Sequence, residues 1–339
     1  MPTTSTSPSS LPDLVQCCFN LIAVKSASDL TPAWAHLGAS SKDHAAEDLV
    51  AWQEGTDSSK ELADQLLEII KQDVLTASKS SHLTYKQVDL STGPLVIDAL
   101  NNISELETRC PRLSYNSVTK TLDAEVMSTF THDCHQEWLQ REIRRMISSQ
   151  FTTEAEFDSC LKTMVESSFA NFQSPYAGSR KEPDMAIKPR GVQGLPSFVI
   201  ESGWTENLTD LHEDMRLWLI GGSGHVRLVL LLKWTKIPSK RVIGVAESWS
   251  RDATGSPNLQ ETVVIFPEPH AGGANQTIRI TRGQLFGAAL PHGRNPADVF
   301  GLSVSTLRRE AREAMRDHGF VPMTHVTPST PNFPSKLQQ

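Results

Sequence analysis

Hydrophobic and polar positions alternate most clearly in the middle of the chain. Residues 113–127 (LSYNSVTKTLDAEVM) alternate around a polar centre, which predicts a β-hairpin or one strand with its turn. A helix is expected at about 131–149, with Thr131 as its N-cap. The positions that share its inner face are His135, Leu139, Ile143 and Met146. A second helix is expected at 152–166.

The next segments predict a strand pair followed by a crossover. Residues 183–189 (PDMAIKP) and 197–203 (SFVIESG) are short apolar strands joined by a turn-rich loop. Residues 207–220 are helical, and 225–237 form a long apolar strand that we expect to be buried on both faces. A strand, a helix and another strand in this order imply a right-handed parallel crossover.

The flanking segments are less regular. Residues 45–76 have helical spacing, 80–110 have strand or loop character, and further strands and a last helix at about 303–318 follow residue 240. The Ser/Thr/Pro-rich ends are too polar to fold. We therefore divide the chain into disordered tails at 1–12 and 323–339, a helical N-terminal extension at 13–110, an α/β core at 111–240, and strands and a helix at 241–322 that complete the same domain.

Composition narrows the functional classes. The net charge of −7 argues against a broad basic surface for nucleic acid, although it leaves room for a local basic groove. The five cysteines are odd in number and form no CxxC pair, so we expect reduced thiols rather than disulfides or a zinc site. With no signal sequence, and with Leu228–Leu232 as the longest apolar run, we expect an intracellular protein, cytoplasmic or nuclear, that is neither secreted nor membrane-bound.

Two acids occupy positions where strands are otherwise apolar. Asp184 begins the first strand of the pair, and Glu201 lies near the end of the second, on the same face as Ser197 and Val199. Burying such a carboxylate without a partner is costly, and a divalent metal is one good partner. Two carboxylates on adjacent strands suit Mg²⁺, which prefers oxygen ligands and keeps several waters.

These segments together resemble a known superfamily. The matching residues are Met127, His132, Asp133, Pro183, Asp184, Pro196 to Glu201, Gly203, Trp204, Thr205, Glu206, Leu211, Asp214 and Trp218. The set resembles the PD-(D/E)XK, or restriction-endonuclease-like, nucleases, and more closely an uncharacterised fungal group within them. The resemblance covers about residues 110–240 and extends with fewer matches to about 322. It implies an α/β fold with a mixed β-sheet core flanked by helices.

The resemblance also implies roles. Asp184 and Glu201 would hold Mg²⁺ or Mn²⁺, and Asp133 would support the metal or its water. The family's lysine belongs two residues after the glutamate, where this chain has Gly203. We favour Arg216, on the following helix, as its replacement. Lys233, on the long strand, is the second candidate. Lys188 shares a strand face with Asp184 but lies about 13 Å from it along the strand, which is too far.

Two functions follow. The first is a metal-dependent nuclease that hydrolyses DNA or RNA; the second is a catalytically inactive binding or scaffold protein that keeps the nuclease fold. Asp133 has an alternative role in stabilising a helix N-terminus, and Glu137 is the alternative acid. The last helix carries Arg308, Arg309, Arg312 and Arg316, which either contact phosphate or form an ordinary salt-bridged surface.

Overall fold

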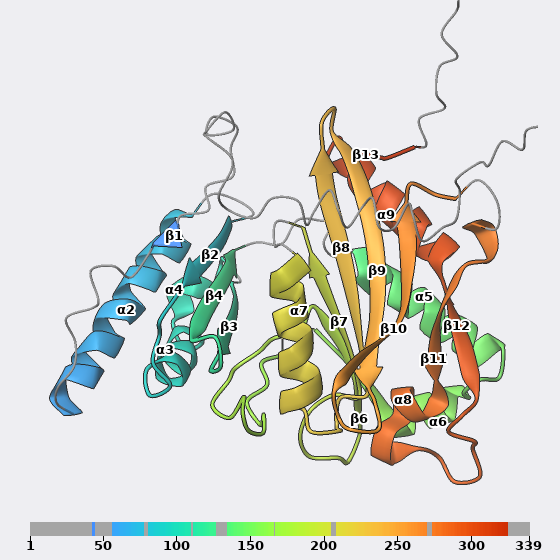
Figure 1. The fold of residues 1–339 in the computed structure, drawn as a ribbon, viewed down its shortest axis with the longest axis horizontal. Coiled ribbons are helices and arrows are strands. Elements are labelled where there is room, and N and C mark those ends of the chain that lie inside the picture. Colours follow the sequence, from blue (N-terminus) through green and yellow to red (C-terminus); the bar gives the residue numbers. More distant parts are fainter. Residues whose placement is uncertain are drawn as a thin grey trace, which may run out of the picture.

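The computed structural model describes residues 43–44, 56–77, 81–109, 111–126, 134–165, 167–204, 208–269 and 273–324. Within these ranges the chain is a mixed α/β fold with a curled mixed sheet and flanking helices, and a smaller sheet stands beside it (Figure 1). The predicted tail at 1–12, and nearly all of the predicted tail at 323–339, lie outside the described residues.

The smaller sheet belongs to an N-terminal unit that packs around its own core. Its elements are β1 (Asp43–His44), α2 (Thr56–Thr76), β2 (Ser81–Tyr85), α3 (Gly93–Leu100), α4 (Ser104–Glu107), β3 (Arg112–Asn116) and β4 (Thr121–Val126). The strand order is β1-β2-β4-β3, and β4 is antiparallel to both β2 and β3. Leu83, Leu122 and Ala124 face α2 and α3 in the buried core. Strand alternation therefore turns residues such as Arg112 and Asp123 toward the opposite face.

The structure confirms the hairpin at 113–127 but assigns it differently. β4 pairs with both β2 and β3, and this hairpin joins the N-terminal sheet rather than the strands that follow, so the boundary expected at residue 110 falls inside that sheet. The N-terminal unit is also not purely helical, because it contains this sheet. Residues 93–100, expected as strand or loop, form α3.

The larger sheet contains the predicted strand pair and crossover. Its elements are β5 (Leu161–Met164), β6 (Met185–Pro189), β7 (Phe198–Gly203), β8 (Leu228–Ile237), β9 (Arg241–Arg251) and β10 (Pro257–Phe266), with β13 (Val321–Pro322) beside β9. The order is β10-β9-β8-β7-β6-β5. β5, β6 and β7 form an antiparallel meander, and β7 is parallel to β8. The helix α7 (Leu208–Arg216), extended by a π-helical turn at Leu217–Gly221, connects the parallel strands.

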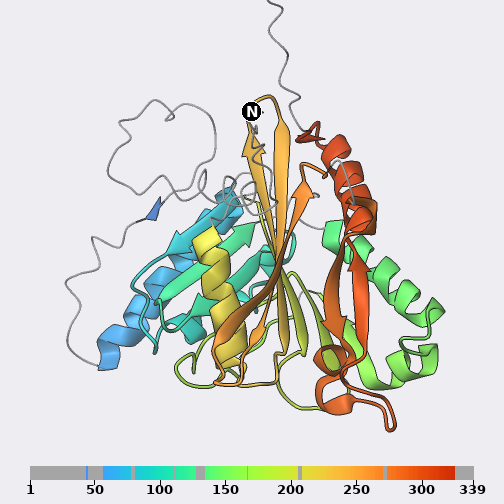
Figure 2. The same cartoon turned by 45° about the vertical axis from the view of Figure 1, so that its right-hand side comes forward.

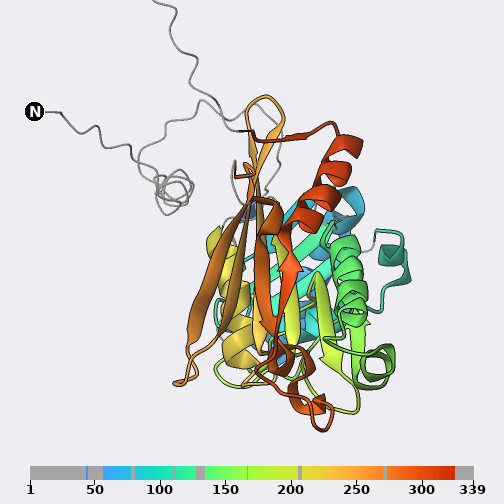
Figure 3. The ribbon, with the colours of Figure 1, turned by 90° about the vertical axis from the view of Figure 1, so that its right-hand side faces the viewer.

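Helices cover both faces of this sheet. The helix α7 packs on one face, while α5 (Cys134–Ser148) and α9 (Val304–Asp317) pack on the other (Figures 2 and 3). The remaining elements are α6 (Glu154–Cys160), β11 (Thr277–Thr281), α8 (Arg282–Phe286), β12 (Val299–Ser303) and two short 3-10 turns. Segments after residue 240 share the sheet and the core of the central segments. None of the helices in the described ranges combines the length and the apolar character that crossing a bilayer requires.

Candidate functional site

The two strand carboxylates of the sequence motif lie opposite each other. β6 and β7 are antiparallel, and their register pairs Met185 with Ile200. The next pair in this register joins Asp184, directly before β6, to Glu201 on β7. Residues paired in this way have Cβ atoms about 4.5–5.5 Å apart. Both side chains are buried, with exposed fractions of 6% for Asp184 and 5% for Glu201.

Asp184 is held from two sides. Its Oδ2 accepts a hydrogen bond from the backbone N–H of Ser202 at 2.5 Å. Its Oδ1 accepts a hydrogen bond from the guanidinium of Arg112, which comes from β3 of the N-terminal unit. Arg112 also lies 3.8 Å from Oε2 of Glu125 on the neighbouring strand β4. The N-terminal sheet thus places a cation directly on the first carboxylate.

Glu201 has a different environment. Its Oε1 accepts a hydrogen bond from Nε1 of the fully buried Trp218 at 2.5 Å. Its Oε2 lies 4.0 Å from Nζ of Lys181. Burial raises the pKa of Glu201 well above the usual value for a carboxyl, and the positive charge of Lys181 opposes this rise. The proton affinity of Glu201 therefore depends on the lysine beside it.

Lys181 is anchored by a second acid. Its Nζ donates a hydrogen bond to Oδ2 of Asp214, on α7, at 2.7 Å. Burial raises the pKa of Asp214, and the charge and hydrogen bond of Lys181 oppose that rise. An antiparallel bridge between Phe169 and Lys181 fixes the irregular segment that carries the lysine. Lys181 thus stands between Asp214 and Glu201.

A small cavity of about 30 Å³ lies between the two sheets. The larger sheet and the segment before it contribute Lys181, Glu182, Asp184, Glu201 and Ser202; the N-terminal sheet contributes His82, Arg112, Leu113, Ser114, Asp123 and Glu125. Oδ1 of Asp123 accepts one hydrogen bond, of 2.7 Å, from the Thr84 hydroxyl and lies 3.1 Å from Nε2 of His82. The polar face of the N-terminal sheet therefore covers the carboxylate pair.

Of the other predicted site residues, Arg216 and Lys233 do not line this cavity. Asp133 lies outside the described residues. Arg216 is partly exposed and pairs with Glu213 on its own helix. Lys233 is paired with Gly203 in the parallel register, and its Nζ donates to the carbonyl oxygens of Trp204 and Trp234 at 3.4 and 3.1 Å. The lysine beside the carboxylates is Lys181, which the motif did not indicate.

A small divalent cation would require Arg112 to leave Asp184, because the oxygens of both carboxylates already contact nitrogen atoms of the protein. Carboxylates outnumber permanent cations in the cavity lining, and the volume suffices for one water or ion. Within the described ranges, no group of three or more His, Cys, Asp or Glu side chains is arranged to hold an ion. An ion would therefore rest on Asp184 and Glu201 with water completing its shell, which is a coordination that Mg²⁺ accepts.

Sequence reasoning missed three contributors for different reasons. Lys181 lies in an irregular segment with no periodic pattern. Trp218 was quoted as a match of the motif; the structure buries it in the core, where its indole N–H donates to Oε1 of Glu201. Arg112 could have been noticed, because alternation along β3 places it on the polar face of its sheet.

Comparison with known proteins adds nothing to this site. The chain matches no family model, no curated protein and no solved structure. What we propose for Asp184 and Glu201 therefore rests on their geometry and on the resemblance of the motif, and what we propose for Lys181 rests on its geometry alone.

Proposed function

We propose that the chain is a Mg²⁺- or Mn²⁺-dependent phosphodiesterase that hydrolyses DNA or RNA on a restriction-endonuclease-like core. The observation that carries the proposal is the position of Asp184 opposite Glu201 on neighbouring strands, with both carboxylates buried. Support also comes from the element order, in which α5 precedes an antiparallel meander and α7 leads to a parallel strand. That order agrees with the arrangement that the motif implies.

The residues around the pair have separable tasks. A divalent ion held by Asp184 and Glu201 would lower the pKa of a bound water and offset phosphate charge. The N–H groups of Ser202 and Trp218 orient the two carboxylates. Lys181 supplies a fixed positive charge beside Glu201, in the role that the family gives to the lysine at position 203. Because Asp214 favours the protonated ammonium, we assign Lys181 an electrostatic role rather than that of a general base.

Substrate binding requires the N-terminal sheet to move. The cavity holds a single water-sized species, and Arg112 lies on Asp184. A phosphodiester cannot reach the carboxylates while β3 covers them. The structure therefore corresponds to a closed form of the proposed enzyme.

A specific observation favours the second candidate, a non-catalytic binding or scaffold protein. Arg112 and Lys181 already compensate the charges of Asp184, Asp214 and Glu201 without any metal. Buried acids with such partners can persist as a structural network after catalysis is lost.

A nuclease assay separates the two candidates. Single- and double-stranded DNA and RNA are incubated with Mg²⁺ or Mn²⁺ and with wild type, Asp184→Ala, Glu201→Ala, or Asp158→Ala as an exposed control on α6. Metal-dependent cleavage that is lost only in the two cavity variants supports the enzyme. Cleavage that survives in both cavity variants places the activity elsewhere. No cleavage, together with no metal-induced rise in melting temperature, favours the second candidate, because an ion that binds the folded state stabilises it.

A further inference from the structure

A second and much larger cavity lies near the start of β8. Its volume is about 730 Å³, within the usual range of small-molecule sites. Three segments that are distant in sequence form its walls: the residues before β8, the turn between β9 and β10, and the region around α8. The residues that line it are Gly224, Val226, Arg227, Ser250, Arg251, Asp252, Ala253, Thr254, Gly255, Thr281, Gly283, Gln284, Pro296 and Ala297.

Two arginines in this lining have no acidic partner in the part of the chain that the structure describes. Among the described residues, neither Arg227 nor Arg251 forms an ion pair with a carboxylate. Arg227 is exposed, and the one hydrogen bond recorded for its guanidinium is a long one, of 3.4 Å, to the carbonyl oxygen of Gly283. Nε of Arg251 donates to the carbonyl oxygen of Gly255 at 2.8 Å, which leaves both terminal nitrogens of this guanidinium available. Unused guanidinium N–H groups favour an anionic ligand with several acceptor oxygens.

The turn between β9 and β10 is built to hold Arg251 in place. Gly255 has φ +89°, which favours glycine, and a Cβ atom there would lie 2.4 Å from Nη2 of Arg251 and would displace the guanidinium. Asp252 is the one acid among the lining residues, and its Oδ1 accepts from the backbone N–H groups of Thr254 and Ser256 and from the Thr254 hydroxyl. These hydrogen bonds lower the pKa of Asp252. Asp252 thus holds the turn through Oδ1 and forms no ion pair with Arg251 in the described structure.

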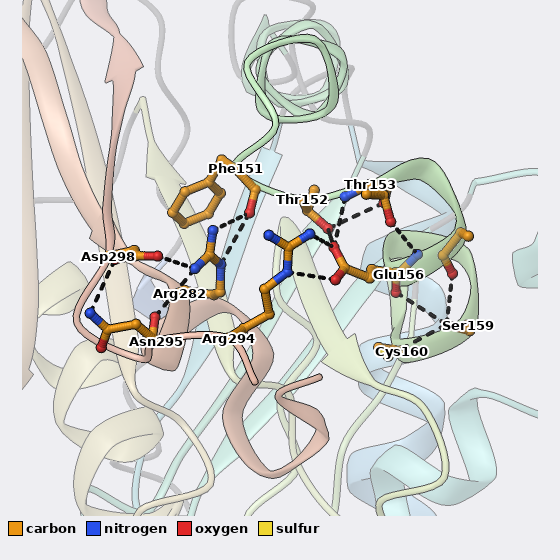
Figure 4. A network of polar contacts seen from close by, with 11 residues as sticks. Phe151, Thr152, Thr153, Glu156, Ser159, Cys160, Arg282, Arg294, Asn295 and Asp298 are labelled. Atoms are coloured by element: carbon orange, nitrogen blue, oxygen red, sulfur yellow. Dashed lines mark hydrogen bonds and ion pairs between the residues drawn. The ribbon is translucent and has the colours of Figure 1, made fainter. Parts of the chain in front are cut away.

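The opposite wall is held by a separate polar network (Figure 4). Arg282 is buried and donates to the carbonyl oxygen of Phe151 from Nε at 3.0 Å and Nη2 at 2.6 Å, and it also pairs with Asp298. Arg294 donates two hydrogen bonds, of 2.6 and 2.8 Å, to the carboxylate of Glu156. These contacts fix the loop that carries the lining residues Pro296 and Ala297. Because this wall is already ordered, the protein loses less conformational entropy when a ligand binds.

We propose that this cavity binds a phosphate-bearing ligand through Arg227 and Arg251. The phosphate oxygens would accept from the two guanidinium groups, with the hydroxyl of Ser250 as a further donor in the lining. The cavity greatly exceeds the size of inorganic phosphate, and its apolar residues, such as Val226 and Pro296, leave room for the organic part of the ligand. The ligand is therefore a phosphorylated small molecule of nucleotide size or a segment of a nucleic acid strand.

The proposed site is independent of the carboxylate pair. The two cavities share no lining residue. Arg227 precedes Leu231, the partner of Glu201 in the sheet, by four residues, which is about 13 Å along a strand. The site can therefore bind phosphate whether or not the chain hydrolyses nucleic acid.

Calorimetric titration of the full chain tests the proposal. The probes are inorganic pyrophosphate, adenosine monophosphate and a single-stranded oligothymidylate, at constant ionic strength and without divalent ions. The variants are Arg227→Gln and Arg251→Gln, and the matched control is Arg279→Gln, an exposed arginine on β11 that lies outside the lining. Thermal melting verifies that each variant is folded, and Arg227→Gln serves as the test if Arg251→Gln loosens its turn.

The expected result is binding by wild type and Arg279→Gln, weakened about tenfold or more in Arg227→Gln, because each charge-assisted hydrogen bond contributes roughly that factor. Binding of the small probes indicates a small-molecule ligand, whereas binding of the oligonucleotide alone indicates a strand. The proposal is overturned if no probe binds, if Arg227→Gln binds as wild type does, or if Arg279→Gln loses affinity equally.

Discussion

Lys181 and Asp214 form an ion pair with Nζ 2.7 Å from Oδ2, and the side chains are only 9% and 19% exposed. The pair lies directly beside Glu201, so the same lysine compensates two acids. Removing one partner of a buried ion pair leaves an uncompensated charge and typically costs about 3–5 kcal/mol. Replacing Lys181 alone would therefore change both stability and catalysis, so that the two effects could not be separated.

A paired substitution separates these effects. We expect Lys181→Met to destabilise the fold by about 3 kcal/mol, because Asp214 and Glu201 lose their cation. In Lys181→Met combined with Asp214→Asn, stability should largely return, as measured by urea unfolding. Metal-dependent cleavage should stay reduced about a hundredfold, because the charge beside Glu201 is still missing.

The control for this experiment is Lys162→Met, an exposed lysine on β5, which should leave both stability and cleavage unchanged. Wild-type cleavage in the double variant would show that Lys181 is a structural partner of Asp214 and nothing more.

Arg112 should compete with a divalent ion for Asp184. In Arg112→Ala the carboxylates of Asp184 and Glu201 lose a nearby cation, so an added Mg²⁺ or Mn²⁺ should bind more tightly. The expected observation is a larger rise in melting temperature with added metal than in wild type, since stabilisation grows with the ratio of ligand to its dissociation constant.

Arg180→Ala is the matched control for Arg112→Ala. Arg180 joins the N-terminal unit to the rest of the chain through hydrogen bonds of 3.1 and 3.2 Å to Asp98, without touching Asp184. If both variants respond to metal equally, a general loosening of the interface explains the gain rather than competition at Asp184.

The hydrophobic pattern of the sequence alone predicts those helices and strands whose buried residues recur at a regular spacing. β6, β7, α7 and β8 appear near the expected residues, and the parallel pairing of β7 with β8 is confirmed. The proximity of Asp184 and Glu201 followed from the same reasoning, because both acids sit at ends of adjacent strands. The metal, the nuclease activity and the nucleic-acid partner remain predictions.

Tertiary contacts decided the elements that the pattern missed. The helix expected at 152–166 ends at Cys160, because the next residues pair with β6 as β5. The α3 segment had a helical signal in Val96, Ile97 and Leu100, with proline in the first turn, but its short apolar run also suited a strand. Lys181 could not be placed from sequence, since only long-range bridges fix its segment.

The arginines of the last helix divide into buried and exposed members. Arg308 is fully buried and donates to the carbonyl oxygens of Val264, Ile265 and Gly273 at 2.6–2.8 Å. It therefore holds the fold together and does not contact phosphate. We expect Arg308→Met to cost more than about 3 kcal/mol in urea unfolding, because it leaves several buried acceptors unsatisfied.

Arg308→Lys should rescue little of this loss, because an ammonium cannot reproduce the planar fork of a guanidinium. Arg316→Met, on an exposed position of the same helix, is the control and should change stability by less than about 0.5 kcal/mol. A mild effect of Arg308→Met would contradict the buried arrangement.

The pair of Glu156 and Arg294 should make stability depend on pH in acid. The hydrogen bonds from Arg294, assisted by the backbone N–H of Thr153, lower the pKa of Glu156 from 4.5 to about 2. The unfolded chain therefore binds a proton at this group before the folded chain does. Its contribution to stability is complete above about pH 4.5 and is lost as the pH falls toward about 2.

Glu156→Gln removes this contribution while keeping a residue that can cap α6. The difference in the free energy of urea unfolding between wild type and Glu156→Gln should be largest near neutral pH. It should decrease continuously as the pH is lowered to about 3. Glu154→Gln, exposed in the same helical turn, should show a much smaller pH-dependent difference. A constant difference between wild type and Glu156→Gln over this range would mean that the ion pair with Arg294 does not form in solution.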